Sequence, residues 1–295
     1  MSAPISHRCD FVYLFDCLDG NPNGDPDAAN QPRVDPQTLH GLVSDVCLKR
    51  KIRNFAQSLG QPIFVQHHGV LNAEIAKAEP KPKDGKERNR EERISAQKWM
   101  CAHYYDVRSF GAVMSTGTNA GQVRGPVQLT FSRSIDPVSP LDLSITRVAI
   151  TREEDVDKKE TEMGRKNLIP YGLYRCHGFI SANLAAQTGF SEDDLALLWD
   201  ALKMMFDQDR SAARGTMAAR RLIAFKHVGT DSDQKKREAQ AKLGCAPAHK
   251  LFELVEVKRR ADVQTPRRFE DYDTVACPPK GPLAAFPGVE VLDLV

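Results

Sequence analysis

Residues 9–18 form the run CDFVYLFDCL, which is rich in aromatic and β-branched residues. Such a run is typical of a buried strand, and it stops at a cluster of Gly, Pro and Asn residues. The cluster, DGNPNGDPDAANQPRVDP at 19–36, contains four prolines and two glycines. Proline interrupts helices and cannot donate to a strand ladder, so we predict a long, turn-rich loop that is neither helix nor ladder strand.

A helix is predicted after this loop, from about Thr38 to Leu59, because apolar residues recur at helical spacing and Gly60 follows. This apolar row should face the sheet. Its members are Leu48, Ile52, Phe55 and Leu59.

The remaining elements follow from the same periodicities. Ser191 with Asp194 forms a variant of the capping box, and apolar residues at helical spacing up to Phe206 predict a core helix. A short polar helix is expected near 233–243. Strands are predicted at 128–134, 141–151, 171–184, 221–229 and 251–259. With insertions set aside, the order indicates an α+β, ferredoxin-like βαββαβ fold, which RNA-recognition modules share.

The composition narrows the class of protein. With 295 residues and 41% hydrophobic content, the chain can bury a large core. Its 41 basic and 39 acidic residues nearly balance, so attraction to a polyanion must come from local clusters. The seven cysteines are odd in number and lack CxxC spacing, which favours neither disulfides nor zinc. No apolar run suits a membrane span and no signal peptide is recognisable, so we expect a cytoplasmic protein.

The acids around the 19–36 loop have several readings. Part of the loop follows the spacing of an EF-hand calcium site, but Asn30 stands where the bidentate Glu should be. A magnesium site for phosphodiester cleavage is a second reading. Its acids would be Asp16, Asp19, Asp25, Asp27 and Asp35. Acidic surface turns are far commoner than metal sites, so we favour a structural or phosphate-contacting loop and predict neither metal nor cofactor.

The densest basic cluster of the first half, KRKIR at 49–53, lies on the predicted helix. Lys49, Arg50 and Arg53 lie opposite the apolar row, and Lys51 lies to one side. The one-turn spacing of Lys49 and Arg53 suits neighbouring phosphates of a nucleic acid. A solvated helix face is the alternative, but only Asp45 occupies a position to neutralise these cations, so most of the charge should be uncompensated.

Two further segments are candidates for phosphate contacts. The Gly-rich segment 115–126 lacks a Walker lysine, and a plain surface loop is as good a reading of it. The bend at 208–228 carries a second basic cluster, whose alternative roles are solvation or pairing with the acidic run 153–162. Outside the predicted helix, the candidate residues for contacts with RNA phosphates in the loop and in these two segments are Arg33, Ser115, Thr116, Asn119, Arg124, Arg214 and Arg221.

Two long motifs carry a resemblance to a known family. They are FDCLDGNPNGDPDAANQPRVDPQTLHGLVSDVCLKRKIRN at 15–54 and MGRKNLIPYGLYRCHGFIS at 163–181. Together they resemble the backbone subunit of the type I-C CRISPR interference complex, Cascade, and the likeness spans the chain. The first motif is long and unusual, so it is far more specific than a short pattern.

The resemblance implies one modified RRM-like domain over 1–295, with a ferredoxin-like palm, a finger-like insertion at 61–138, a thumb-like insertion at 152–170 and a C-terminal extension at 230–295. Within the fingers, the highly charged residues 72–98 are expected to be solvated rather than part of a core. The resemblance also implies that copies of the chain polymerise along a guide crRNA. The guide pairs with target DNA, and other Cascade subunits are further partners.

The same resemblance assigns roles to residues. Lys49, Arg50 and Arg53 would grip the guide, and a thumb would kink it at regular intervals. The thumb candidates are Met163, Arg165 and Lys166. Distant type III relatives cut target RNA with an acid in the loop after the first strand, so a metal-dependent ribonuclease is the alternative function. The type I likeness predicts a non-catalytic subunit instead.

Overall fold

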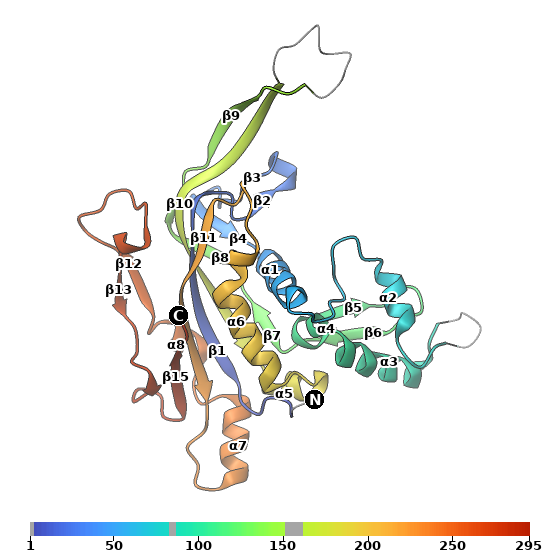
Figure 1. Ribbon diagram of the computed structural model, residues 1–295. Coiled ribbons are helices and arrows are strands. Elements are labelled where there is room, and N and C mark those ends of the chain that lie inside the picture. The colour runs from blue at the N-terminus through green and yellow to red at the C-terminus, as the bar shows by residue number, and fades with distance from the viewer. Residues whose placement is uncertain (1–2, 83–86, 151–161) are drawn as a thin grey trace.

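The fold is built on one antiparallel sheet (Figure 1). The computed structural model describes residues 3–82, 87–150 and 162–295, and in these residues the sheet has nine strands. Seven of them lie side by side in the order β14, β15, β11, β1, β10, β8, β4, and β7 and β9 also pair with β10. Their bounds are β1 (Cys9–Gly20), β4 (His40–Val43), β7 (Val127–Leu129), β8 (Ser132–Pro137), β9 (Leu141–Arg147), β10 (Glu162–Ile180), β11 (Thr216–His227), β14 (Gly281–Pro282) and β15 (Val289–Asp293).

Strand β1 lies in the middle of the sheet because both of its edges are paired. It pairs with β10 from Cys9 opposite Ile180 to Gly20 opposite Ile169, and with β11 along its other edge. Its side chains alternate between the two faces of the sheet, as the geometry of a strand requires. The predicted strand at 9–18 is confirmed and extends two residues further.

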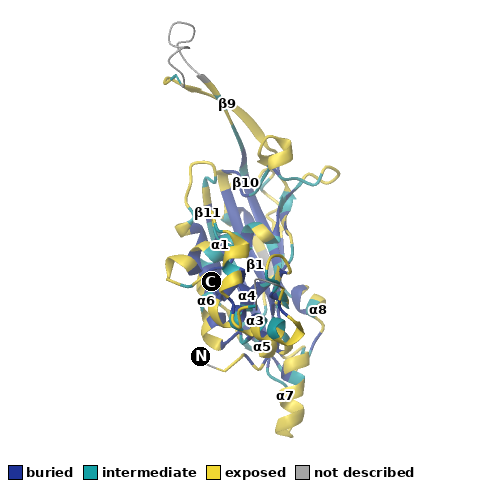
Figure 2. Ribbon diagram, turned by 90° about the vertical axis from the view of Figure 1, so that its right-hand side faces the viewer, coloured by how far each residue is buried: buried dark blue, intermediate teal, exposed yellow. Residues whose placement is uncertain are grey.

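Helices α1 (Asp45–Ser58) and α6 (Glu192–Gln208) cover one face of the sheet (Figures 1 and 2). Phe11, Tyr13 and Phe15 of β1 pack there with Leu48 and Leu202 from the two helices. The Tyr13 hydroxyl also donates to the backbone carbonyl of Leu202 at 2.6 Å. The capping box that predicts α6 is present, with Ser191 and Asp194 bonded reciprocally.

The C-terminal part of the chain covers the other face. Helix α8 (Ala248–Phe252) and the pair of strands β12 (Glu256–Arg259) and β13 (Tyr272–Ala276) contribute to a second core. Val12 and Leu14 of β1 are buried in it beside Phe252 and Val255. The prediction of one strand at 251–259 is therefore wrong in its first part. Leu251 and Phe252 belong to the helix α8 and are buried there, and only Glu256–Arg259 form a strand.

A separate lobe lies beside the helical layer and has its own core (Figure 1). It consists of α2 (Leu71–Lys77), α3 (Arg90–His103), α4 (Tyr105–Phe110), β5 (Gly111–Met114) and β6 (Gly121–Arg124). Most described residues of 72–98 are exposed, as predicted, but the segment is not wholly outside a core, since Ile75, Ala78 and Ala96 are buried in that of the lobe. Residues 115–126, predicted as a loop, include the strand β6 of a hairpin.

A long hairpin of β9 and β10 projects from the sheet (Figures 1 and 2). All seven residues of β9 are exposed. The strand β10 begins at Glu162, whereas the prediction starts it at Tyr171, and it ends at Ile180, where α5 (Ala182–Thr188) follows. Of the predicted thumb at 152–170, residues 152–161 lie outside the described residues.

The segment between β1 and α1 differs from the prediction in two ways. Strands β2 (Gly24–Asp25) and β3 (Gln31–Pro32) form a small ladder around the 3-10 helix η1 (Pro26–Ala28), so the loop does contain ladder strand and helix. Proline at the start of η1 is tolerated because no amide donor is needed there. The helix α1 begins at Asp45 and not at Thr38, because residues 40–43 pair with β8 as β4.

The other predicted boundaries shift less. Leu48, Ile52 and Phe55 are buried as predicted, but Leu59 is 59% exposed because it caps the end of α1. The strand β11 begins at Thr216, inside the predicted bend. Helix α7 (Gln234–Leu243) confirms the short polar helix, and the 3-10 helix η4 spans Phe269–Asp271. In the described residues, none of the helices is long and apolar enough to span a bilayer.

Asp106 should be a main determinant of stability, because it joins α1 to the lobe. This carboxylate is 1% exposed and accepts hydrogen bonds from Arg53 Nε at 2.8 Å and from the amides of Phe64 and Val65 at 2.8 and 3.1 Å. We expect Asp106→Ala to lower the free energy of unfolding by about 3 kcal/mol, measured by urea titration, since it leaves buried donors unpaired. Lys77→Ala, which breaks an exposed pair with Glu74, is the control and should change it by less than about 0.5 kcal/mol.

Candidate nucleic-acid interface

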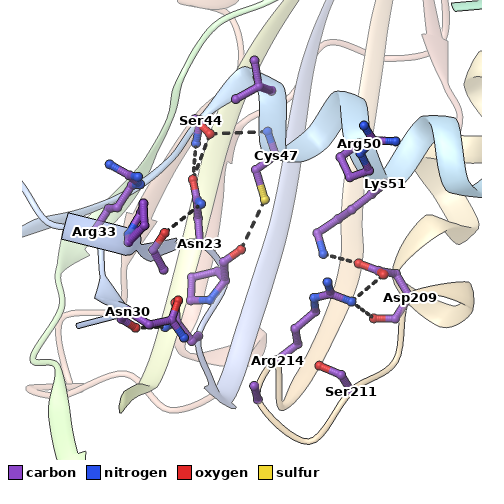
Figure 3. A pocket seen from close by; sticks show the side chains of 16 residues that line it. Asn23, Asn30, Arg33, Ser44, Cys47, Arg50, Lys51, Asp209, Ser211 and Arg214 are labelled. Carbon is purple, nitrogen blue, oxygen red and sulfur yellow. Dashed lines mark hydrogen bonds and ion pairs between the residues drawn. The ribbon is translucent and has the colours of Figure 1, made fainter. Parts of the chain in front are cut away.

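A polar pocket of about 510 Å³ opens where three segments of the chain meet (Figure 3). They are the loop that follows β1, the N-terminal turn of α1, and the turn that joins α6 to β11. The N–H of Asn21 donates to the carbonyl of Ala213 at 2.8 Å, which ties the first segment to the third. Gly20 permits this approach, because a Cβ there would lie 2.0 Å from the carbonyl oxygen of Arg214.

Asn23 fastens the loop to the start of α1. Its Oδ1 accepts hydrogen bonds from the amide and the hydroxyl of Ser44, both at 2.9 Å. Ser44 is the N-cap of α1, and its hydroxyl oxygen accepts from the amide of Cys47 at 3.3 Å. Burial raises the pKa of the Cys47 thiol, which makes this cysteine a poor nucleophile and a poor metal ligand.

Cationic side chains dominate the lining of this pocket. Four cations and one carboxylate face it, namely Arg33, Arg50, Lys51, Arg214 and Asp209. Asp209 binds two of them, with Oδ2 on Lys51 Nζ and Oδ1 on Arg214, whose NH1 also donates to the Asp209 carbonyl at 3.1 Å (Figure 3). Asp25 also pairs with Arg33, so two positive charges remain after both carboxylates are counted.

Arg33 and Arg50 are held from outside the pocket. Arg33 NH1 lies 3.2 Å from Asp25 Oδ2. Arg50 NH1 donates to the carbonyl of Val65 at 2.8 Å, and burial, with a smaller effect of Arg53, lowers the Arg50 pKa. A guanidinium keeps its charge under such a shift, so both arginines face the pocket as cations.

A second pocket of about 200 Å³ adjoins the first and leads to the base of the β9–β10 hairpin. The two pockets share Asn30 and Ala213 in their linings. Arg165 and Lys166 of the hairpin line the second pocket, and Arg165 NH1 lies 3.2 Å from Asp142 Oδ2. We call the combined lining of the two pockets, from α1 to the hairpin, the basic track.

The basic track suits a strand that carries several phosphates. Arg33, Arg50, Lys51 and Arg214 are held by carboxylates or carbonyls, so little side-chain entropy would be lost on binding at these four cations. The N-terminal turn of α1 adds amide donors and the positive end of the helix dipole. The arrangement offers positioning and charge, and no metal-binding acids. In the residues that the structure describes, His, Cys, Asp and Glu side chains nowhere form a group of three that could hold a metal ion.

The structure separates the basic residues predicted on α1. Arg50 lines the track, but Lys49 Nζ lies 3.0 Å from Asp45 and Arg53 Nε lies 2.8 Å from the buried Asp106. Asp45 is the acid that the sequence placed near Lys49, but the expectation that Arg53 is uncompensated is wrong. The partner of Arg53 stands 53 residues away in the sequence, so helical spacing could not reveal it.

The other predicted residues divide between the track and distant positions. Arg33, Arg214, Arg165 and Lys166 line the track, and Met163 lies on the same hairpin with 79% of its surface exposed. The lobe carries a second group at its β5–β6 hairpin, namely Ser115, Thr116, Asn119 and Arg124.

Contacts of this second group are local. Thr116 donates to Asn72 Oδ1 at 2.7 Å, and the Asn119 side chain accepts from the amide of Gly121 at 2.9 Å. Arg221 lies on β11 outside both pockets, with NH1 3.7 Å from Asp293. These residues are not brought together with the basic track.

Several residues of the track are not among the predicted ones. Lys51 is 3% exposed, and sequence position alone places it beside the basic face rather than in a pocket. Its partner Asp209 is 158 residues away. Asn21, Asn23 and Asn30 do lie in the motif at 15–54, and the unusual Asn content of this turn-rich loop was the available signal.

Comparison with known proteins identifies the family. Residues 7–277 match the family model described as CRISPR-associated protein Cas7. The chain belongs to the Cas7 family. A curated relative from Haloferax volcanii with the same description is 28% identical in an alignment of 228 residues that covers 67% of this chain and 64% of the relative. This Cas7-family chain thus matches less than two thirds of the length of that relative.

The fold of this Cas7-family chain is similar to one seen in a solved RNA-guided complex. A chain of a "CRISPR RNA-guided surveillance complex, pre-nicking" aligns with 83% of this chain and 86% of its own length. The TM-score is 0.50 and the sequence identity 13%, so the likeness concerns the fold. It supports a mixed α/β architecture with a large antiparallel sheet.

Asp209 should be essential to the stability of the pocket. Lys51 is buried, so Asp209→Ala leaves an uncompensated charge and should lower the free energy of unfolding by about 3 kcal/mol in urea titration. Adding Lys51→Met should restore most of this loss, because the double variant buries no unpaired charge. A double variant as unstable as Asp209→Ala alone would contradict the assigned pairing.

Proposed function

We propose that this chain is a non-catalytic subunit that binds a guide crRNA along the basic track and presents it for pairing with target DNA. The observation that carries the proposal is a pair of pockets that are both lined by cations and share Asn30 and Ala213, in a protein of the Cas7 family. Phosphate contacts of this kind give affinity and register without reading the sequence, as a subunit that must accept different guides requires. The motif at 15–54 supports the type I-C subtype.

The strand order supports a ferredoxin-like palm within the sheet. In chain order, β1, β8, β10 and β11 would be the four palm strands, with α1 after the first and α6 after the third. They lie in the order β11, β1, β10, β8, each antiparallel to its neighbour. The split order, in which the first and third strands are central, is the one that the βαββαβ pattern requires.

The insertions fit the roles of fingers and thumb. We assign the fingers to the lobe of α2, α3, α4, β5 and β6, within 61–138, and the C-terminal extension to 230–295. The thumb would be the β9–β10 hairpin, with Met163 exposed on it and Arg165 and Lys166 at its base. Further copies of the chain and other Cascade subunits would then meet along the guide.

A metal-dependent ribonuclease that uses the loop aspartates is the second candidate. The described contacts of these acids favour structural roles. Asp16 is buried, accepts from Tyr171 and Arg220, and has its pKa raised by burial. Asp25 and Asp35 are paired with Arg33 and Arg133.

Removing one cation of the track should weaken RNA binding and reduce its dependence on salt. We expect Arg214→Gln to bind a labelled single-stranded RNA more weakly than the wild type, with the slope of log K against log salt smaller by about one, measured by fluorescence anisotropy. The control is Arg221→Gln, which makes the same change of charge outside both pockets. Equal slopes for Arg214→Gln and the wild type would refute the site.

The native assembly should contain RNA of defined length. Purified from cells that supply guides, the complex is expected to show nucleic-acid absorbance at 260 nm and a discrete RNA band in a denaturing gel. An assembly with the absorbance of protein alone would contradict the proposed function.

Incubation of the assembled complex with complementary RNA and magnesium separates the two candidate functions. We expect no cleavage, because the loop acids hold no cluster of three metal ligands in the described residues. Cleavage that disappears in Asp25→Ala or Asp27→Ala would establish the ribonuclease instead.

A further inference from the structure

Buried polar atoms without a hydrogen-bond partner gather along the basic track. In the described residues, six buried side-chain nitrogen or oxygen atoms lack a partner, and three belong to residues that line the two pockets. These are Asn21 Oδ1, Arg33 Nε and Asn167 Oδ1. Buried polar atoms in folded proteins are nearly always bonded, so three unpaired atoms along one surface call for a ligand or ordered water.

The two asparagines share one arrangement. Asn21 Nδ2 donates to the carbonyl of Asn30 at 2.6 Å, and Asn167 Nδ2 donates to the carbonyl of Ala29 at 2.9 Å. Each amide is therefore committed through its nitrogen to the turn after η1 and keeps its oxygen unpaired. The reverse orientation of Asn21 would set two carbonyl oxygens 2.6 Å apart, so the contact fixes which atom is the acceptor.

Asn21 is the better defined of the two. Its residue is only 6% exposed, and its backbone N–H donates to Ala213, the neighbour of Arg214. Asn21 and Arg214 thus line one pocket, on two segments that this backbone hydrogen bond ties together.

A phosphate cannot satisfy these acceptors. Phosphodiester oxygens only accept hydrogen bonds, so they pair with the arginines and lysines and not with an amide oxygen. The ligand must carry a donor close to its phosphate. In RNA this donor is the ribose 2′-hydroxyl, whereas DNA has none at this position.

We propose that Asn21 Oδ1, together with Asn167 Oδ1 in the adjoining pocket, accepts hydrogen bonds from ribose 2′-hydroxyl groups and selects RNA over DNA. The inference rests on the proposed function, since it assumes that a nucleic acid occupies the basic track. A DNA strand on the same cations would leave both acceptors buried and unpaired, which is the costly alternative to a made hydrogen bond. The track would therefore combine charge for affinity with two neutral acceptors for the choice of sugar.

Chemically altered ligands test this on the unaltered full chain. Three strands of one sequence are compared by fluorescence anisotropy: RNA, fully 2′-fluoro RNA, and DNA. The fluoro strand keeps an RNA-like sugar pucker but cannot donate a hydrogen bond. We expect the wild type to bind RNA about 25-fold more tightly than the fluoro strand, a factor of about five for each of the two lost hydrogen bonds. Equal affinities would overturn the proposal and leave ordered water as the partner of these oxygens.

Variants locate the effect. Asn21→Leu should lose part of the preference for RNA over 2′-fluoro RNA, because Asn167 still accepts, and the double variant Asn21→Leu with Asn167→Leu should bind the two strands with nearly equal affinity. The control is Asn54→Leu, the same change at an exposed residue outside both pockets, which should keep the wild-type preference. The full preference retained in Asn21→Leu would refute the role of Asn21. The wild-type ligand series decides the question even if Asn21→Leu folds poorly.

Different results would refute the proposed function and the inference about the 2′-hydroxyl. If Arg214→Gln leaves RNA affinity and salt dependence unchanged, the proposed function fails. If Arg214→Gln weakens binding but the wild type does not distinguish RNA from its fluoro analogue, only the inference about the 2′-hydroxyl fails.

Discussion

The hydrogen bonding of β1 along both of its edges constrains the rest of the molecule. A strand with partners on both sides cannot shift by one residue without exchanging its two sets of side chains, because alternate residues are buried in different cores. The end of β1 is fixed for the same reason, and with it the loop that starts at Asn21. The position of the basic track therefore depends on the centre of the sheet as much as on its own side chains.

Local sequence pattern was enough to predict the helices and strands whose periodicity and capping residues lie within the element itself. The strand at 9–18 and the helix capped by Ser191 have this character, and both are present. The start of α1 was not predictable in this way, because residues 40–43 become a strand only through pairing with β8, some ninety residues further along the chain. The predicted strand at 251–259 was wrong in its first residues for a similar reason. Leu251 and Phe252 adopt a helix because of how they pack in the second core, which lies outside the local sequence pattern.

In the candidate site, local sequence likewise does not show which basic residues are paired with acids. Sequence pattern located Arg33, Arg50 and Arg214 as basic residues but gave no account of which cations are neutralised. Asp106 neutralises Arg53 and Asp209 neutralises Lys51, and both acids lie far away in the sequence. A buried cation needs a fixed counterion, so the acids of a basic surface determine its shape, and acids far apart in sequence are invisible to local spacing.

Strand β10 links the sheet to the projecting hairpin without interruption. Residues 169 and 171–180 pair with β1, and residues 162–168 pair with β9, so the partner of β10 changes between Leu168 and Ile169, next to Pro170, which is left out of the register with β1. At about 3.3 Å per residue, these 19 residues span roughly 60 Å. Both ladders belong to one strand, so a change in the direction of the hairpin would disturb the pairing next to the central sheet. Whatever the hairpin touches is consequently held at an angle set by the twist of the sheet, and the geometry of an assembly would be inherited from the core of each subunit.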